Sequence, residues 1–338
     1  MTPIKIAING FGRIGRSLFR LLLDNPEIEV VAVNDLANVN TLAHLLKYDS
    51  IHGRLDRTVS VTNDTTVVVV VVDGVEFPFT NQPDISSINW TPFQPDVVIE
   101  CTGKFKTKEI LQNHIIGGTK KVILSVPPIE DDIKTIVLGV NNHLLDGTEQ
   151  IISNASCTTN NAAPMLKVVH DLCQVEQAYI TTVHSYTTDQ SLHDQPHRDL
   201  RRARAAGQSI VPTTTGAAKA LTKIFPDLEH AIGGCGIRVP VPNGSLTDMT
   251  LNVKRKTTVK EINEAFKKAS ETNLKNILSY TEDPIVSIDI IGLPYSCTFD
   301  AQMTSVIDGT LVKLIGWYDN ERGYSNRIID LIYCISSK

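Results

Sequence analysis

The sequence predicts an α/β protein of two domains, in which a doubly wound parallel sheet is followed by an α+β domain with a mainly antiparallel sheet. Length is the first observation, because 338 residues exceed one average domain. In the first half, short apolar strands alternate with helical segments, which is typical of βαβ units, whereas strands cluster in the second half. We expect the first domain over residues 1–156, completed by a helix over 321–338, and the second over 157–320.

The composition is that of an ordinary soluble globular protein, with 42% apolar and 20% charged residues. A formal net charge of −5 argues against a nucleic-acid coat. Six cysteines without CxxC pairs support neither a zinc site nor a disulfide framework, and free thiols fit a reducing compartment. The chain opens on a strand without a basic leader, and its most apolar run, residues 67–72, is too short to span a bilayer. We therefore expect a cytoplasmic protein that needs no metal, membrane or nucleic acid.

A glycine-rich turn follows the first strand and opens the first helix. Gly10, Gly12 and Gly15 form the pattern G-x-G-x-x-G, and Asp35 closes the next strand. Gly10 permits the tight turn, Gly12 lets the backbone approach a pyrophosphate, and Gly15 allows close helix–strand packing. Asp35 can accept hydrogen bonds from ribose hydroxyls and would repel a 2′-phosphate. The pattern predicts a Rossmann domain that binds NAD rather than NADP.

Two later strands of the same domain, 96–100 and 121–124, end in polar residues. Ligands of parallel sheets bind beyond the carboxyl ends of the strands. Thr102, Gly103 and Ser125 are therefore candidates to line the cofactor, although any one of them could be a plain turn residue. Between the glycine turn and these strands, residues 65–77 predict a hairpin with its turn at residues 73–74.

The reactive group of the second half is predicted to be a cysteine in a polar run. Cys157 lies among hydroxyl and amide side chains in residues 153–160, whereas structural cysteines usually have apolar neighbours. A following helix N-terminus would favour the thiolate, so Cys157 suits a nucleophile; the alternative is a half-buried cysteine at a strand-to-helix turn. His184 ends the strand 179–183 and could be its base, although lone histidines at strand ends are more often structural. A thiolate together with NAD predicts aldehyde oxidation through a thiohemiacetal and a thioester.

The remainder of the second half contains a long irregular segment and several expected elements. Residues 188–211 show little regular pattern and hold a basic cluster, which favours a functional or interface loop. Residues 212–216 place hydroxyls before a helix, as a phosphate seat or a simple N-cap would. The expected strands are 236–240, 246–254, 285–291 and 311–318, and the expected helices are 217–224, 259–276 and 323–335.

Six stretches resemble the glyceraldehyde-3-phosphate dehydrogenase family in order and spacing. They are residues 9–16, 153–160, 184–187, 199–206, 212–219 and 319–321. The resemblance implies a glycolytic enzyme, normally a homotetramer, that converts D-glyceraldehyde 3-phosphate, NAD and inorganic phosphate to 1,3-bisphosphoglycerate and NADH. It also implies that the loop over about 185–207 meets the cofactor of a neighbouring subunit.

The same resemblance implies a role for individual residues. Cys157 would be the nucleophile and His184 its activating base. The residues implied to bind the attacking phosphate are Ser156, Thr158, Thr215 and Gly216. Those implied to hold the C3 phosphate of the substrate are Thr187, Arg202 and Arg238, and those implied to contact NAD are Arg13, Ile14, Asp35, Ser125 and Asn320.

Three positions depart from the family pattern. Asn161 replaces a second cysteine often found four residues after the nucleophile, which would remove a local disulfide and leave the chemistry intact. Arg322 stands where many members have tryptophan, so the local packing beside Asn320 is in question. Asn81 stands where some members have an adenine-side arginine, so that contact is not expected here.

Two prolines carry information of their own. Pro196 resembles the NAD-preferring versions of the loop, in agreement with Asp35. Pro164 conflicts with an unbroken helix from Cys157, because its ring would clash with the carbonyl of Asn160. We therefore expect that helix to start later or to bend.

Two other functions are open at the level of sequence. A sister enzyme acting on erythrose 4-phosphate would share Cys157, His184 and the fold. A non-catalytic, NAD-responsive protein could use the basic cluster at residues 198–204 on RNA or a partner, although intact Cys157 and His184 argue against lost catalysis.

Overall fold

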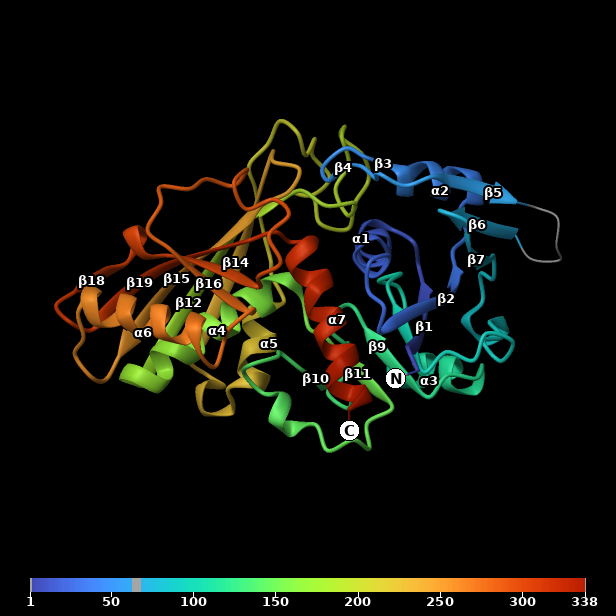
Figure 1. Ribbon diagram of the computed structural model, residues 1–338. Coiled ribbons are helices and arrows are strands. Elements are labelled where there is room, and N and C mark those ends of the chain that lie inside the picture. The colour runs from blue at the N-terminus through green and yellow to red at the C-terminus, as the bar shows by residue number, and fades with distance from the viewer. Residues whose placement is uncertain (1, 63–67, 338) are drawn as a thin grey trace. The chain divides into compact units, whose positions relative to one another are not determined.

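A computed structural model describes residues 2–62 and 68–337 (Figure 1). The chain divides into two compact units. The first comprises Met1–Ile136, His143–Ala155 and Ile328–Lys338, and the second Val137–Asn142 and Ser156–Arg327. The last helix, α7 (Arg322–Ser336), thus contributes residues to both units. Among the described residues, no helix has the length and apolar composition of a membrane span.

The first unit is built on a nine-stranded sheet with the order β10-β11-β9-β8-β1-β2-β7-β6-β5. The strands from β10 to β7 run parallel, and β6 and β5 are antiparallel additions. Their bounds are β1 (Ile4–Asn9), β2 (Ile28–Asn34), β5 (Val59–Thr62), β6 (Val68–Val72), β7 (Val75–Thr80), β8 (Val97–Glu100), β9 (Lys121–Leu124), β10 (Lys134–Thr135) and β11 (Ile151–Ser153), with a small separate pair β3 (Tyr48–Asp49) and β4 (Gly53–Arg54). Strand order reverses between β1 and β8, which is the switch point where doubly wound sheets bind ligands. The predicted parallel α/β sheet is confirmed.

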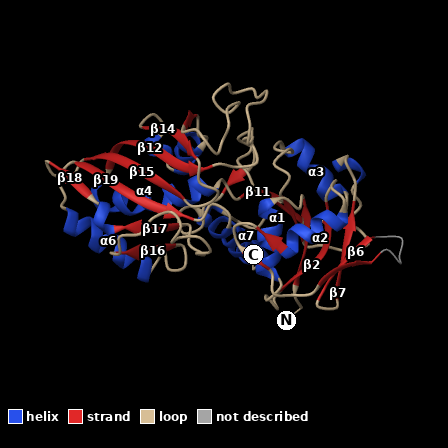
Figure 2. Cartoon of the chain, turned by 90° about the horizontal axis from the view of Figure 1, so that it is seen from above, coloured by secondary structure: helices blue, strands red, loops and turns tan. Residues whose placement is uncertain are grey.

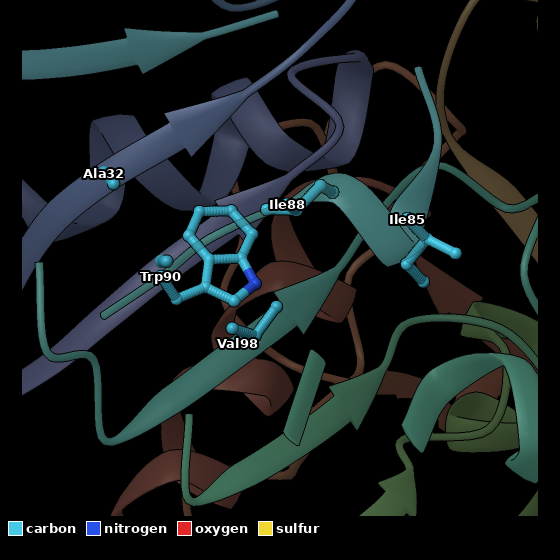
Figure 3. Packing of buried hydrophobic residues seen from close by; sticks show 6 residues of the cluster. Ala32, Ile85, Ile88, Trp90 and Val98 are labelled. Carbon is cyan, nitrogen blue, oxygen red and sulfur yellow. The ribbon is translucent and has the colours of Figure 1, made fainter. Parts of the chain in front are cut away.

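Apolar faces explain how the helices of this unit pack. Helix α1 (Arg13–Leu22) buries Leu18, Phe19 and Leu22, in the spacing of one helical face. The other two helices are α2 (Val39–Lys47) and α3 (Lys108–Ile116). Trp90 packs with Ala32 of β2 and Val98 of β8 in a fully apolar cluster (Figure 3). Because Ala32 and Val98 both pair with Ala7 of β1, this cluster covers one face of the sheet at its central strands.

The predicted hairpin is formed by β6 and β7, which pair from Val68 with Phe79 to Val72 with Val75. Asp73 and Gly74 both have positive φ, 49° and 84°, as a two-residue hairpin turn requires. Residues 65–67 of the prediction lie outside the described residues.

The second unit is built on an eight-stranded sheet with the order β13-β14-β12-β15-β19-β17-β16, and β18 pairs with β19. Most pairs are antiparallel, with parallel pairs only at β12–β14 and β16–β17 in the described chain. Bounds are β12 (Val175–Ser185), β13 (Val211–Thr213), β14 (Ile232–Val239), β15 (Ser245–Val253), β16 (Leu278–Thr281), β17 (Cys297–Asp300), β18 (Ser305–Ile307) and β19 (Leu311–Tyr318); helices are α4 (Cys157–Cys173), α5 (Ala217–Ile224) and α6 (Val259–Glu271). The predicted mainly antiparallel sheet is confirmed.

One predicted strand, 285–291, is wrong. The residues form turns instead, because the Asp289 carboxylate accepts the N–H of Val286 and its own N–H returns to the Val286 carbonyl. Alternation was the misleading signal, since Val286 and Ile288 are exposed rather than covered. Strands β16 and β17, on either side of these turns, were not predicted.

The two faces of the second sheet differ in burial. Ile180 and Leu314 lie buried on the face that meets α4, where Gly316 leaves room for the sulfur of Met165. Tyr179, on the opposite face, is 53% exposed. Figure 2 shows β12, β15 and β19 in front of the helices in a view from above. Within the described residues of this unit, the face that carries Tyr179 is thus the more exposed one, and we call it the uncovered face.

Helix α4 is continuous from Cys157 to Cys173 and contains Pro164. Of the two expected outcomes, a later start is wrong, and a bend stays a prediction. Its first turn is hydrogen bonded, with the N–H of Asn160 donating to the Ser156 carbonyl at 2.9 Å. Pro164 has no N–H to return to the Asn160 carbonyl, so the helix loses one ladder bond there.

Candidate active site

A cavity of about 220 Å³ lies at the carboxyl ends of β1, β2 and β8 in the first unit. Four residues predicted to bind the cofactor line it, namely Gly10, Gly12, Asp35 and Thr102. Sequence reasoning missed further lining residues, including Leu36, Gln82, Pro83, Lys104 and Phe105. Gln82 and Pro83 follow β7, and recognising β7 as a parallel neighbour of β2 would have found them.

The glycine turn packs closely against other backbone at Gly10 and Gly15 and leaves open space at Gly12. Gly10 has φ of 97°, and a Cβ there would lie 2.7 Å from the backbone nitrogen of Thr102. A Cβ on Gly15 would lie 2.2 Å from the Gly10 carbonyl oxygen. A Cβ on Gly12 would meet no protein atom within 4 Å, so the space above this residue is open. The turn therefore fits a pyrophosphate group that approaches the backbone.

Asp35 is held rigidly at the rim of the same cavity. One carboxylate oxygen accepts the N–H of Phe11 at 2.7 Å and the other accepts the N–H of Ala37 at 2.8 Å. Each oxygen keeps a lone pair for a ribose hydroxyl. Asn81 donates its side-chain amide to the Asp35 carbonyl at 3.0 Å, so this departure from the family pattern supports the loop.

The other predicted cofactor residues lie at three different places. Arg13 and Ile14 form the first turn of α1, whose N–H groups point to the sheet edge. The Arg13 guanidinium is paired with both oxygens of Asp49, at 2.6 and 3.2 Å, so its backbone is the part suited to bind an anion. Ser125 follows β9 and is buried, and Asn320 belongs to the second unit.

Cys157 is the first residue of helix α4. Ser156 is the N-cap, with extended backbone angles and a hydroxyl that accepts the N–H of Thr159 at 3.1 Å. The Cys157 Sγ lies 3.5 Å from the Nε2 of His184, across 27 residues of sequence. A nucleophile and a possible base are thus in contact at a positive helix terminus.

His184 projects from β12 and is 5% exposed. Its Nδ1 lies 2.8 Å from the Ser185 carbonyl and 2.6 Å from an Arg238 nitrogen, which also donates to the Ser185 carbonyl at 2.9 Å. When Nδ1 donates its proton to Ser185, the Nε2 lone pair faces the Cys157 thiol and can accept its proton. When Arg238 donates to Nδ1 instead, the proton is on Nε2 and can be donated to a thiolate or an oxyanion.

The electrostatics favour the neutral form of both Cys157 and His184. Burial raises the pKa of the Cys157 thiol, while the charge of Arg238 and the N–H of Thr158 oppose that rise. Burial, followed by the charge of Arg238, lowers the pKa of His184 to about 3, and Arg202 acts in the same direction. A neutral imidazole is therefore available as a base at physiological pH.

Two arginines stand near this pair. Arg202 is fixed by Asp189, by the Thr213 hydroxyl at 3.0 Å and by the Thr214 carbonyl at 3.3 Å. The charges of Arg238 and Arg202 both lower the pKa of His184, so the two arginines belong to the same site. Thr187, the third residue predicted to hold the C3 phosphate, follows β12 directly and is half-buried.

The residues predicted to bind the attacking phosphate fall into two pairs. The Ser156 and Thr158 hydroxyls are bonded within the protein, to Thr159 at 2.8 Å and to Tyr318 at 2.9 Å. Their N–H groups at the start of α4 are thus the more suitable anion donors. Gly216 is the N-cap of α5, and the Thr215 hydroxyl accepts the N–H of Ala217 at 3.3 Å, as in the simple N-capping alternative.

Tyr318 is a site residue that sequence reasoning missed. Its hydroxyl bridges those of Thr158, at 2.9 Å, and Thr182, at 2.8 Å, and its ring meets the His184 ring edge-on at 5.9 Å. Asn320 follows two residues later, and its Oδ1 accepts the hydroxyls of Ser185 and Ser245. These two bonds fix the orientation of the Asn320 amide, whose nitrogen can donate a hydrogen bond to a ligand.

Comparison with known proteins decides the family. The description "Glyceraldehyde 3-phosphate dehydrogenase, NAD binding domain" matches residues 4–108, and "Glyceraldehyde 3-phosphate dehydrogenase, C-terminal domain" matches residues 156–320. The chain belongs to the glyceraldehyde-3-phosphate dehydrogenase family. It is 51% identical to glyceraldehyde-3-phosphate dehydrogenase of Geobacillus stearothermophilus over 336 residues. It is 52% identical to glyceraldehyde-3-phosphate dehydrogenase 2 of Streptomyces avermitilis over 337 residues, and each of these alignments covers 99% of both chains.

Membership of the glyceraldehyde-3-phosphate dehydrogenase family identifies the cofactor of the first unit. NAD is the ligand of the matched domain, and the open space over Gly12 and the fixed carboxylate of Asp35 fit its pyrophosphate and ribose. The chain is an NAD-dependent dehydrogenase. In the described residues no group of His, Cys, Asp and Glu side chains could hold a metal ion.

Two departures from the glyceraldehyde-3-phosphate dehydrogenase pattern have clear surroundings. Asn161 is fully buried, and its Nδ2 lies 3.3 Å from the carbonyls of Ser296, Gly316 and Trp317. Through these contacts Asn161 connects α4 to strand β19 and to the residue before β17. The backbone N–H of Arg322 caps α7 by donating to Asp319 at 2.9 Å, and its side chain is half-buried.

Proposed function

We propose that this chain oxidises D-glyceraldehyde 3-phosphate with NAD and inorganic phosphate to 1,3-bisphosphoglycerate and NADH. The observation that carries the proposal is the 3.5 Å contact between the Cys157 sulfur and His184 at the N-terminus of α4. Its relatives of this name, at 51% and 52% identity over nearly their whole length, support the same substrate.

In the first half-reaction, the Cys157 sulfur attacks the aldehyde carbon. The C–S bond forms as the thiol proton passes to His184 Nε2, and the carbonyl oxygen, once protonated, becomes a thiohemiacetal hydroxyl. His184 then removes the hydroxyl proton while a hydride leaves the same carbon, so that a thioester remains on Cys157. When bound, NAD supplies the acceptor for that hydride. Burial that lowers the pKa of His184 keeps the imidazole in its proton-accepting form.

In the second half-reaction, inorganic phosphate attacks the thioester carbon. The C–S bond breaks, the product leaves as an acyl phosphate, and Cys157 departs as a thiolate that the Arg238 charge stabilises. We assign the attacking phosphate to Ser156, Thr158, Thr215 and Gly216, at the N-termini of α4 and α5. We assign the C3 phosphate of the substrate to Thr187, Arg202 and Arg238, since guanidinium groups bind phosphate oxygens in a bidentate manner.

For the cofactor we assign the first unit, with residues 1–156 and the C-terminal helix as the NAD-binding domain and 157–320 as the catalytic domain. Gly10, Gly12, Gly15 and the first turn of α1 would hold the pyrophosphate, and Asp35 the adenosine ribose. Thr102, Ser125 and the oriented amide of Asn320 complete the assignment.

The deciding experiment is NADH formation followed by absorbance at fixed enzyme and NAD. We expect turnover with glyceraldehyde 3-phosphate that requires inorganic phosphate, and weaker turnover with erythrose 4-phosphate. A preference for the four-carbon sugar would assign the chain to the sister activity. No turnover of either aldehyde, with retained NAD binding, would favour the non-catalytic alternative.

We also propose that the chain assembles as a homotetramer, with the uncovered face of the second sheet as one interface. On this face Val183 pairs with Leu246, and Leu246 pairs with Trp317, so apolar side chains line up across three strands. The loop over residues 185–207 and the residues after it expose Leu192, Leu200 and Ile210, as an interface loop would. A cytoplasmic location stays a prediction.

Sedimentation analysis tests the assembly. Leu246→Glu should shift the protein to smaller species, because a charge would be buried in the interface. The matched control, Lys260→Glu on the exposed side of α6, should sediment as the parent chain does. A parent chain that sediments as a monomer would refute the proposal.

A further inference from the structure

A chain of buried polar side chains runs beneath the cofactor cavity of the first unit. At its centre is the carboxylate of Glu100, the last residue of β8, which is 0% exposed. No lysine or arginine of the described chain pairs with it, and the one basic side chain in contact with it among those residues is His114, also 0% exposed. A buried carboxylate without a cationic arginine or lysine is costly unless hydrogen bonds satisfy it. None of the proposed reaction steps uses Glu100.

The hydrogen-bond directions are fixed from one end of the chain. The indole nitrogen of Trp90 can only donate, and it lies 3.1 Å from the Nδ1 of His114 (Figure 3 shows Trp90). His114 Nδ1 is therefore the acceptor, and the ring proton is on Nε2. That proton points to a Glu100 oxygen 3.1 Å away. His114 is a neutral donor to an ionised carboxylate in this arrangement.

Every other partner of Glu100 donates as well. The Asn9 side-chain amide donates to the same oxygen at 2.6 Å. The second oxygen accepts the backbone N–H of Thr102 at 2.8 Å and also the Thr102 hydroxyl. Both oxygens thus act as acceptors only, which is the property of a carboxylate and not of an amide or a carboxylic acid.

These donors belong to the two segments that meet at the glycine turn. Asn9 immediately precedes Gly10, and Thr102 is the residue against which Gly10 packs, with no room for a Cβ between them. Asn9 and Thr102 both line the cofactor cavity. Glu100 therefore bridges the end of β1 and the loop after β8 from below.

The same network reaches a third lining segment. The Oδ1 of Asn9 accepts the amide of Asn34 at 2.9 Å. The Oδ1 of Asn34 accepts the Thr80 hydroxyl at 2.9 Å and the N–H of Gln82 at 2.8 Å. Gln82 lines the cavity, so one continuous set of bonds ties the ends of β8, β1, β2 and β7.

We propose that Glu100 is a positioning residue for NAD, which sets the spacing of the Asn9–Gly10 turn and the Thr102 loop through acceptor-only hydrogen bonds. The inference rests on NAD binding at this cavity. It predicts that affinity for NAD depends on the charge state and donor pattern of a side chain that the cofactor does not touch.

Glu100→Gln tests the proposal at constant shape. An amide group has to face either Thr102 or the Asn9–His114 pair, and in both places an N–H then meets an N–H. We expect the dissociation constant for NAD, measured by calorimetry well below the unfolding temperature, to rise roughly tenfold to a hundredfold. The control Val122→Ala, in a separate apolar cluster of the same sheet, should lose stability but keep its NAD affinity.

Two further variants keep the test decisive. His114→Phe removes one donor without changing any residue that lines the cavity, so NAD affinity should fall even if Glu100→Gln does not fold. Trp90→Phe frees His114 to take its other tautomer, whose Nε2 can accept a hydrogen bond from the amide introduced by Glu100→Gln, so the two substitutions together should cost less NAD affinity than their sum. Unchanged affinity in both the Glu100 and His114 variants, or strict additivity with Trp90→Phe, would overturn the proposal. A parent chain that does not bind NAD would instead refute the proposed function.

Discussion

The two units place different kinds of groups at their candidate sites. In the first unit, the candidate cofactor contacts combine the main chain of the Gly10 turn with one carboxylate, Asp35, whose oxygens accept backbone N–H groups. The site of the second unit is formed by side chains, in which Cys157 meets His184 and two arginines add positive charge. The first arrangement suits recognition of a fixed cofactor shape, and the second supplies groups that exchange protons.

The two units also differ in how firmly the hydrogen-bond partners of their buried polar groups are fixed. In the first unit, the buried Glu100 carboxylate beneath the cavity accepts hydrogen bonds from Asn9, Thr102 and His114. None of these donors has to carry a charge. In the second unit His184 has two competing partners on Nδ1, Ser185 and Arg238. A base that changes protonation needs alternatives, whereas a binding frame needs a single arrangement.

The largest expected effect separates chemistry from binding. Cys157→Ser should abolish NADH formation from aldehyde, because the thioester cannot form. Its dissociation constant for NAD should equal that of the parent, because the first unit is untouched. Calorimetry and the absorbance assay measure the two quantities, and normal turnover by the serine variant would refute the covalent route.

Next in size is the loss of the base. His184→Asn should lower kcat by roughly 10² to 10⁴ and leave the affinity for NAD unchanged, since the imidazole moves protons without holding the cofactor. A parallel rise in the NAD dissociation constant would show that the two units are not separable in this way.

Arg238 should influence both the charge balance and substrate binding. Because its charge opposes the burial that raises the Cys157 pKa, Arg238→Met should move the midpoint of Cys157 alkylation to higher pH. The thiolate fraction at a fixed pH below that midpoint then falls, so alkylation slows. The kcat/KM for the phosphorylated aldehyde should fall roughly tenfold to a hundredfold through loss of a phosphate ligand. An alkylation midpoint that stays in place or moves down would contradict the electrostatic account.

The smallest effect is expected at the ribose. Asp35→Ala should reduce the preference for NAD over NADP by roughly tenfold, because the repulsion of a 2′-phosphate and the ribose hydrogen bonds are both lost. Turnover at saturating NAD should change little. An unchanged ratio of kcat/KM for the two cofactors would remove Asp35 from that role.

Sequence could predict what depends on neighbours along the chain. The glycine turn and Asp35 belong to one βαβ unit, so their spacing alone implies their geometry. Tyr318 was out of reach for the opposite reason, since its contact with Thr158 spans 160 residues. The same holds for Glu100, whose partner Asn9 lies 91 residues away and whose role depends on two strands being adjacent.

Errors in the predicted elements have two different causes. Residues 285–291 alternate as a strand does, but a carboxylate at Asp289 forms a turn that no periodicity reveals. Pro164 was expected to delay the helix or to bend it, yet the bonds of the first turn and the packing of α4 against β19 keep the helix continuous from Cys157. The turn at Asp289 is a local contact that alternation does not reveal, whereas α4 at Pro164 is supported by tertiary packing.

The amide at position 161 has a consequence for oxidative damage. If peroxide converts Cys157 to a sulfenic acid, the residue one helical turn further on is Asn161, whose amide is committed to three backbone carbonyls. No thiol is present there to capture the sulfenic acid as a disulfide. Recovery of the oxidised chain should then depend on a small thiol supplied from solution, and over-oxidation should compete whenever that thiol is scarce.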